Sequence, residues 1–182
     1  MPTILTHAAV PLAIGLGLGS SAIPGRLLIA GVIASIVPDI DVVSFRLGIA
    51  YADTFGHRGF SHSILFALLL AAFAISLSSR FGVSRKTSFG FVFVATMSHG
   101  VLDMFTNGGL GVALLAPLSD QRYFMPWQVI QVSPLSLHRI MSGRGMEVIW
   151  SELQWVWLPS ALLSMSLLYW RLKRRPARVQ FN

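Results

Sequence analysis

Long apolar runs alternate with short polar segments along the whole chain. The runs cover residues 4–19, 26–45, 60–79, 89–105 and 150–172. A helix needs about 20 mainly apolar residues to cross the hydrocarbon core of a bilayer, so these runs predict about five membrane helices. We therefore expect an all-α fold, a polytopic membrane helical bundle. Three glycines in the first run would let another helix pack closely against it: Gly15, Gly17 and Gly19.

The segments between the runs predict turns and loops within one domain. Residues 110–117 are apolar but too short to span a bilayer, which favours a re-entrant or packed segment. Residues 118–146 predict a longer loop, in which a short amphipathic piece would lie on the membrane surface. We expect a single domain over residues 1–182, with metal-capable motifs in 1–109, an outer loop at 110–149, and the last helix with a basic tail at 150–182.

The composition supports a membrane location and narrows the chemistry. The chain is 54% hydrophobic and 12% charged, against roughly 25% charged residues in ordinary soluble domains. It has no cysteine, which excludes disulfides and thiolate metal ligands. The net charge is +7, yet the basic residues divide between the two faces of the predicted bundle. The expected partner is therefore the lipid bilayer and not a nucleic acid.

The distribution of Lys and Arg predicts how the chain is oriented. The turn at residues 80–88 and the tail beyond residue 170 are the most basic segments, so the positive-inside rule places both in the cytoplasm. Five crossings then put the N-terminus outside and the C-terminus inside. All seven acidic residues fall on the outer side or at the outer ends of helices.

Four short islands of His and Asp reach the outer face in this topology. They are His7; Asp39 and Asp41; His57 and His62; and His99 and Asp103. The last two are four residues apart, so they share one face of a helix, and ionisable groups within a membrane helix are costly and usually functional. Each island alone has an ordinary explanation: an interfacial histidine, a turn, a solvated loop, or an Asp–His hydrogen bond between helices. Together they predict a site for one or two metal ions, at the outer helix ends where water and substrate have access.

This donor set suits hydrolytic chemistry. Nitrogen and oxygen ligands without sulfur favour Zn²⁺, with Mn²⁺ or Fe²⁺ also compatible. A bound metal lowers the pKa of its water and supplies a hydroxide nucleophile. Either Asp39 or Asp41 could be the general base instead of a ligand, and the sequence does not separate these roles. Arg58 could bind a phosphate group, or reach lipid headgroups by snorkelling, and Asn107 begins a small-residue loop that would admit a substrate.

The order of these motifs resembles a known family. Thr6-His7, the segment Pro38-Asp39-Ile40-Asp41, the segment from His57 to Ser63, and the segment from Ser98 to Asp103 follow one another within residues 1–109. This arrangement is similar to the YdjM-like family of LexA-regulated, inner-membrane-associated metal-dependent hydrolases of bacteria. The resemblance implies a helical protein of the bacterial inner membrane that acts as a hydrolase.

A more distant similarity bears on the reaction. The His-x-x-x-Asp pair, an upstream Asp and an N-terminal ligand are similar to parts of the zinc-dependent phospholipase C pattern. Those enzymes also use a later His-x-x-x-Glu pair, whereas here the later histidine is His138 and position 142 is Ser142. The resemblance therefore favours hydrolysis of a phosphoester in a lipid or lipid-linked substrate at the periplasmic face. A small metal or ion transporter and a non-catalytic membrane protein stabilised by metal remain as alternatives.

Overall fold

The computed structural model describes residues 1–133 and 143–174, and the regular secondary structure within them is entirely helical. The two β-bridges that occur are isolated pairs in loops. The prediction of an all-α fold is therefore confirmed for the described residues. The elements are η1 (Thr6–Ala8), α1 (Ala9–Leu18), α2 (Gly25–Ile36), η2 (Val37–Val42), α3 (Val43–Arg46), η3 (Phe60–His62), α4 (Ile64–Ser76), α5 (Ser78–Phe81), α6 (Arg85–Met104), α8 (Gly143–Glu152), the π-helical turn η4 (Leu153–Trp157) and α9 (Leu158–Lys173).

Some sequence predictions fall outside the described residues. They concern part of the long loop, at 134–142, and the basic tail from residue 175 onwards. His138, Ser142, Arg175 and Arg178 are among these positions. The loop in which an amphipathic piece is predicted, residues 118–146, is therefore described only at 118–133 and 143–146.

One described helix is long and apolar enough to cross a membrane. It is the continuous segment Gly25–Arg46, formed by α2, η2 and α3, with 22 residues and a hydropathy of 2.0. Thr6–Leu18 and Ile64–Ser76 are apolar but shorter. Within the described ranges, length and hydropathy together identify this single candidate span, so the arrangement of five spans stays a prediction.

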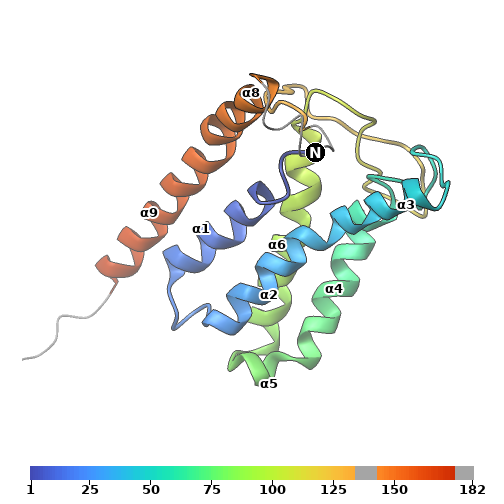
Figure 1. The fold of residues 1–182 in the computed structure, drawn as a ribbon. Helices are drawn as coiled ribbons and strands as arrows, with labels where there is room; N and C mark the ends of the chain where they lie inside the picture. Colours follow the sequence, from blue (N-terminus) through green and yellow to red (C-terminus); the bar gives the residue numbers. More distant parts are fainter. Residues whose placement is uncertain (134–142, 175–182) are drawn as a thin grey trace, which may run out of the picture.

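The helices pack around α6, which contacts both α2 and α4, while α1 lies along α9 (Figure 1). Small residues allow these contacts. A Cβ atom added at Gly17 would lie 2.7 Å from Leu167 Cβ and 2.9 Å from the carbonyl oxygen of Ser164, both in α9. A Cβ atom at Gly31 of α2 would lie 2.3 Å from the Phe91 ring of α6. The expected close packing of the first helix is confirmed at Gly17.

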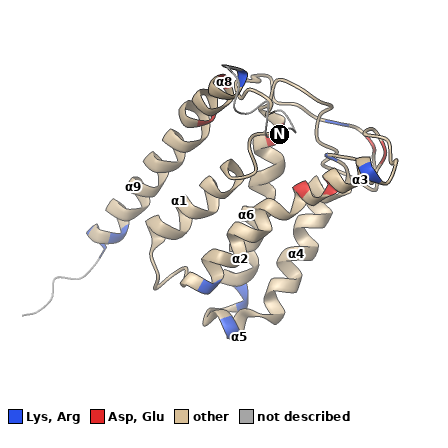
Figure 2. Ribbon diagram, in the orientation of Figure 1, with Lys and Arg blue, Asp and Glu red and all other residues tan. Residues whose placement is uncertain are grey.

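Charges divide between the two ends of the bundle (Figure 2). Lys and Arg gather at one end, where α2 begins, α5 lies and α9 ends. The acidic residues gather at the other end, near the junction of α2 with α3 and at α8, together with a smaller number of basic residues. The end of α6 that carries His99 and Asp103 lies on the acidic side.

Candidate metal centre

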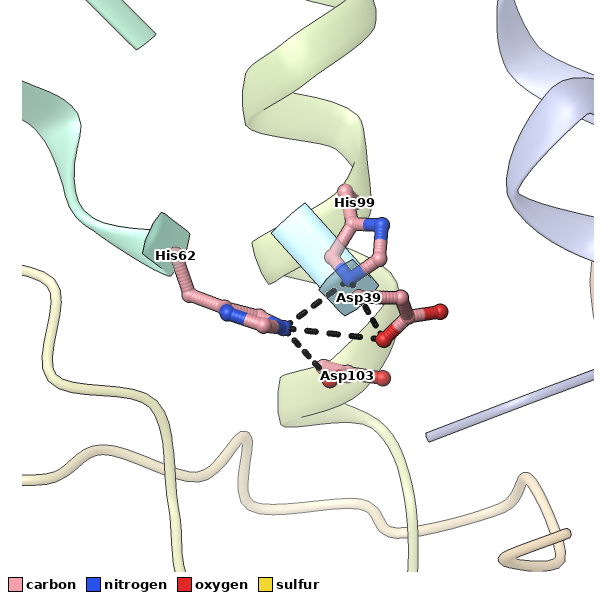
Figure 3. Close-up of side chains that lie close together, drawn as sticks. All are labelled: Asp39, His62, His99 and Asp103. Carbon is pink, nitrogen blue, oxygen red and sulfur yellow. Dashed lines mark hydrogen bonds and ion pairs between the residues drawn. The ribbon is translucent and has the colours of Figure 1, made fainter. Parts of the chain in front are cut away.

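Four side chains from three separate segments converge at this acidic end (Figure 3). Asp39 comes from η2, His62 from η3, and His99 and Asp103 from α6. One donor atom of each lies within 4.8 Å of the donor atoms of the other three. None of the four residues is more than 5% exposed. Four of the seven predicted ligands are thus brought together in one buried cluster.

The chain reaches this arrangement through a change of helix type. α2 ends at Ile36, and a 3-10 helix with Pro38 in its first turn follows it. Because proline has no N–H group, it cannot continue the α-helical hydrogen-bond pattern. The tighter turn buries Asp39 within the bundle, while Ile40 stays exposed.

The two histidines of the cluster are oriented by hydrogen-bond acceptors on their outer nitrogens. His99 Nδ1 lies 2.7 Å from the carbonyl oxygen of Ser35, and His62 Nδ1 lies 3.1 Å from Asp41 Oδ2. Both Nδ1 atoms must therefore donate, which leaves a lone pair on each Nε2 of the neutral rings. These two Nε2 atoms are only 2.9 Å apart. Two facing lone pairs repel one another, so a cation, either a proton or a metal ion, is required between them.

The carboxylates complete a donor set that fits one metal ion. Asp39 Oδ1 lies 3.4 Å from His99 Nε2 and 4.0 Å from His62 Nε2, and Asp103 Oδ2 lies 3.3 Å from His62 Nε2. Ligand atoms around a tetrahedral ion with bonds of about 2.0 Å are about 3.3 Å apart. None of the four oxygens of Asp39 and Asp103 makes a hydrogen bond with the described residues. Asp103 is paired with Arg58 Nε at 3.0 Å, whereas the ion pairs of Asp39 within the described residues involve histidines alone. A buried carboxylate without hydrogen bonds is costly, and a metal ion would compensate it.

Asp41 and His57 lie behind His62, outside the group of four. Asp41 Oδ1 is 2.6 Å from His57 Nδ1, and its Oδ2 accepts hydrogen bonds from the Arg58 backbone N–H at 3.0 Å and from Ser61 Oγ at 2.6 Å. The sequence places both residues among the metal ligands. In the structure, Asp41 instead orients His62, in the manner of the carboxylates that support metal-bound histidines.

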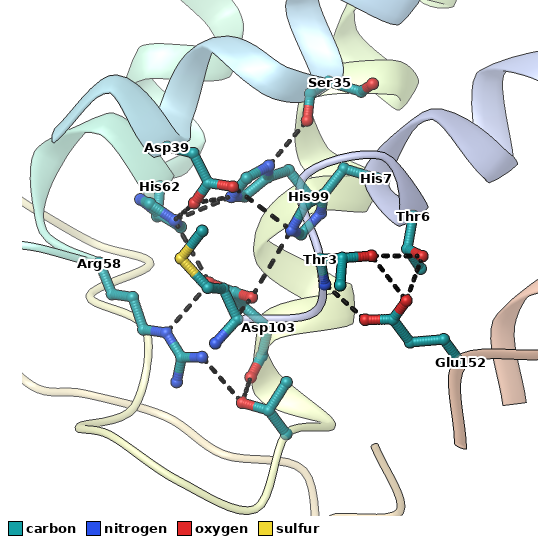
Figure 4. A network of polar contacts seen from close by, with 12 residues as sticks. Thr3, Thr6, His7, Ser35, Asp39, Arg58, His62, His99, Asp103 and Glu152 are labelled. Atoms are coloured by element: carbon teal, nitrogen blue, oxygen red, sulfur yellow. Dashed lines mark hydrogen bonds and ion pairs between the residues drawn. The ribbon is translucent and has the colours of Figure 1, made fainter. Parts of the chain in front are cut away.

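His7 reaches the cluster from the N-terminal turn η1. Its ring stacks on that of His99, with centroids 3.6 Å apart and planes inclined by 13°. His7 Nε2 faces the oxygens of Asp39 and Asp103 that point away from the other histidines, at 3.7 and 3.9 Å (Figure 4). His7 is therefore part of the site, although it does not belong to the group of four.

Arg58 is fully buried beside Asp103. Its Nε lies 3.0 Å from Asp103 Oδ2, its Nη2 donates to Thr106 Oγ1 at 2.8 Å, and its Nη1 donates to the carbonyl oxygens of Gly108 and Leu110 at 3.0 and 3.3 Å. Its backbone has a φ of 60°, in the left-handed region. The predicted role in phosphate binding would require the guanidinium to leave these partners.

Asn107 joins two loops. Its Nδ2 donates to Gln131 Oε1 at 2.7 Å, and its Oδ1 accepts from the Val132 backbone N–H at 2.9 Å. Both polar ends of the side chain are therefore engaged within the chain. A role in substrate binding stays a prediction.

The cluster is closed to solvent, contrary to the expectation of open access at the helix end. His99 and Asp103 do lie near the end of α6, but both are 0% exposed. The N-terminal segment covers one side of the cluster, and the Arg58 side chain covers another side (Figure 4). The expectation failed because a helix end is exposed only when no other segment folds over it.

Glu152 holds the N-terminal segment in this place, a role that sequence reasoning missed. This glutamate is 3% exposed and accepts hydrogen bonds from the backbone N–H and hydroxyl of Thr3 and from the hydroxyl of Thr6. Trp157 Nε1 also donates to Thr6 Oγ1, at 3.1 Å. Glu152 is the one acidic residue of the mainly apolar run 150–172, so the argument applied to His99 and Asp103 would have singled it out.

Arg122 binds the backbone of the loop that carries His57 and Arg58. Its Nη1 donates to the carbonyl oxygens of both residues, at 3.1 and 3.3 Å, and its Nη2 donates to that of Tyr51 at 3.0 Å. Partial burial lowers the pKa of Arg122 and raises the pKa of the neighbouring Tyr51 hydroxyl. The loop is thus a scaffold that fixes the backbone beside the cluster.

The fold and the site together define a class of protein. Large apolar side chains are exposed along α1, α2, α4 and α9, for example Leu16, Ile29, Phe73 and Leu162. Such surfaces are typical of helices in contact with lipid. The molecule is a helical membrane protein with a buried cluster of His and Asp that could hold a metal ion.

Comparison with known proteins identifies the family. The family model described as YdjM inner membrane protein matches residues 1–177, and the chain belongs to this family. The chain is also 52% identical over 172 residues to the inner membrane protein YbcI of Escherichia coli (strain K12), covering 94% of this chain and 99% of that protein. The resemblance stated from the sequence motifs is therefore confirmed. No solved structure matches the chain.

Proposed function

We propose that this protein is a metal-dependent hydrolase of the bacterial inner membrane, acting on a phosphate-containing lipid or lipid-linked substrate. The observation that carries the proposal is the 2.9 Å contact between His62 Nε2 and His99 Nε2, with both Nδ1 atoms held by acceptors. Two lone pairs and two carboxylates directed at one point are the donor set of a divalent cation. Zn²⁺ suits four nitrogen and oxygen ligands best, and Mn²⁺ or Fe²⁺ is compatible.

The residues around the cluster would have different roles in hydrolysis. A bound metal ion would supply an activated water near neutral pH. Asp41 holds His62 in the required tautomer and accepts three further hydrogen bonds, so it has little capacity to take up a proton. Asp39 has an oxygen, Oδ2, without a hydrogen-bond donor. In a site that holds one metal ion, Asp39 is therefore the better suited of the two candidates for general base.

A groove beside the cluster supports the proposal that the substrate is a lipid. It has a volume of about 280 Å³, and its apolar walls come from Ile40, Phe55, Phe60 and Phe66. Asp41 and Ser61 line its polar part, and both contact His62. In a protein of the inner membrane, the hydrocarbon chain of a lipid is the occupant that these walls suit. The polar head of that lipid would then lie next to the residues that orient the metal ligands.

The proposal includes the predicted topology of about five spans with the N-terminus outside. The separation of basic and acidic residues between the two ends of the bundle supports it. The cluster at the acidic end would then face the periplasm. Its confinement to that end also argues against a transporter, whose ligands would be distributed through the depth of the membrane.

One observation favours a second candidate function. The four donors could fill a tetrahedral coordination sphere, and all are buried. Closed four-ligand sites are typical of structural metals, whereas catalytic zinc keeps a position for water. The alternative is therefore a non-catalytic membrane protein stabilised by its metal ion.

Metal analysis of protein extracted in mild detergent tests the proposal. We expect one or two equivalents of transition metal in the wild type and loss of metal in His99→Ala and Asp103→Ala. Glu147→Gln, which changes an exposed acid of α8, is the control and should keep the metal. A wild type that binds no added Zn²⁺, Mn²⁺ or Fe²⁺ would show that a proton joins the two histidines.

A substrate screen separates the two candidate functions. Metal-loaded protein is incubated with phospholipids and polyprenyl phosphates, and the release of phosphate or headgroup is measured. Release by the wild type and not by His99→Ala supports the hydrolase. A metal whose removal lowers the melting temperature, without any release, supports the structural role.

A further inference from the structure

His7 is the one residue of the site whose ring nitrogens both lack a hydrogen bond with the described residues. The side chain is 0% exposed, so water does not satisfy these nitrogens at the surface. A buried polar group without a partner costs about 1–3 kcal/mol, and such groups are rare in native structures. An unpaired imidazole in this position therefore indicates a missing ligand.

The neighbours of His7 show what that ligand is. His7 Nε2 lies 3.7 Å from Asp39 Oδ2 and 3.9 Å from Asp103 Oδ1, and neither oxygen makes a hydrogen bond with the described residues. The α-amino group of Met1 lies 3.8 Å from the same oxygen of Asp103. One nitrogen and two carboxylate oxygens therefore face a common region that attracts cations. The two separations from His7 Nε2 are compatible with ligands of a single metal ion.

Asp39 and Asp103 each direct their two oxygens to opposite sides. Asp39 Oδ1 and Asp103 Oδ2 face His62 and His99, whereas Asp39 Oδ2 and Asp103 Oδ1 face His7 (Figure 4). Carboxylates in this position can bridge two metal ions, and with both ions bound Asp39 would be a ligand and not the general base. Two-metal hydrolytic sites hold their ions about 3.5–4 Å apart, which is the span of a bridging carboxylate.

We propose that the site holds two divalent transition-metal ions, and that His7, Asp39 and Asp103 form the second position. This inference rests on the proposed metal binding by the group of four. The first position has four protein ligands and is closed, while the second has three and keeps a position for water. The second ion is thus the one that would activate water. With fewer ligands, it binds more weakly than the first.

Titration with Mn²⁺, followed by equilibrium dialysis and electron paramagnetic resonance, tests this assignment. We expect the wild type to bind two ions in succession, with a spin-coupled signal when both are present. His7→Ala should bind one ion with nearly unchanged affinity and give the signal of an isolated Mn²⁺. Retention of that first ion shows that the variant is folded. Leu5→Ala, at an exposed position of the same N-terminal segment, is the control and should bind two.

The outcomes distinguish this inference from the proposed function. A wild type that saturates with one ion, and a His7→Ala variant that does the same, overturns the second position and leaves the first intact. Loss of both ions in His7→Ala, with the helical content preserved, assigns His7 to the first ion and also overturns the pair. A wild type that binds no ion overturns the proposed metal site itself.

Discussion

Asp41 and His62 are in contact at the edge of the buried cluster. Asp41 Oδ2 lies 3.1 Å from His62 Nδ1, while Nε2 of the same ring points at His99 and Asp103. A carboxylate on the far nitrogen of a histidine fixes the ring's tautomer and makes it a better metal ligand. Asp41, which lies outside the group of four, would therefore raise the metal affinity of the cluster.

Asp41→Asn should weaken metal binding without abolishing it. An amide can still approach His62, but it no longer carries the charge that favours donation from Nδ1. Loss of such supporting groups costs about 10- to 100-fold in metal affinity. Competition with a chelator of known affinity measures the change. Asp120→Asn, at an exposed carboxylate, is the control, and equal affinities in the two variants would refute a supporting role for Asp41.

Arg58→Met should destabilise the metal-free protein. The substitution leaves Asp103 buried without its cation at 3.0 Å and removes three hydrogen bonds to the loop after α6. Breaking a buried ion pair on one side costs about 3–5 kcal/mol. Denaturant unfolding in detergent would detect this as a lower midpoint. Arg144→Met, at an exposed position, should unfold like the wild type.

Added Zn²⁺ gives the Arg58 experiment a second measurement. A metal ion next to Asp103 supplies the positive charge that the variant lacks, so it should recover part of the lost stability. If both proteins are measured without metal and Arg58→Met has the same unfolding midpoint as the wild type, the ion pair is not important for stability.

Gly17→Ala should loosen the contact between α1 and α9. The new methyl group would lie 2.7 Å from Leu167 Cβ and 2.9 Å from a backbone oxygen, so the helices must move apart. Overpacking of this kind costs about 1–3 kcal/mol. Gly90→Ala is the matched control, since nothing lies within 4 Å of its added Cβ. Thermal unfolding should show a lower midpoint for Gly17→Ala alone.

Reporter fusions test the orientation. Alkaline phosphatase, which is active only outside the cytoplasm, should be active when fused after Gly48 and inactive after Gly82. A fluorescent protein that folds only in the cytoplasm should give the opposite result at the same two positions. The reverse pattern would place the cluster on the cytoplasmic side.

The members of the cluster could be predicted from the sequence because they are polar residues within or beside apolar runs. His99 and Asp103 needed only helical spacing, and Asp39 and His62 followed from the shared end of the bundle. The different position of Asp41 could not be predicted, since it depends on the 3-10 turn after Pro38. Burial of the site was also missed, because contacts between the N-terminal segment and Glu152 leave no periodic pattern in the sequence.

The hydrogen bonds from Thr3 and Thr6 to Glu152 have a consequence for how the protein is made. His7 follows Thr6 directly, yet the carboxylate that holds this turn is synthesised almost at the end of the chain. While ribosomes are still translating the middle helices, the turn lacks these hydrogen bonds. The segment that covers the cluster of His and Asp therefore gains this anchor only after residue 152 has left the ribosome, so an unfinished chain lacks it.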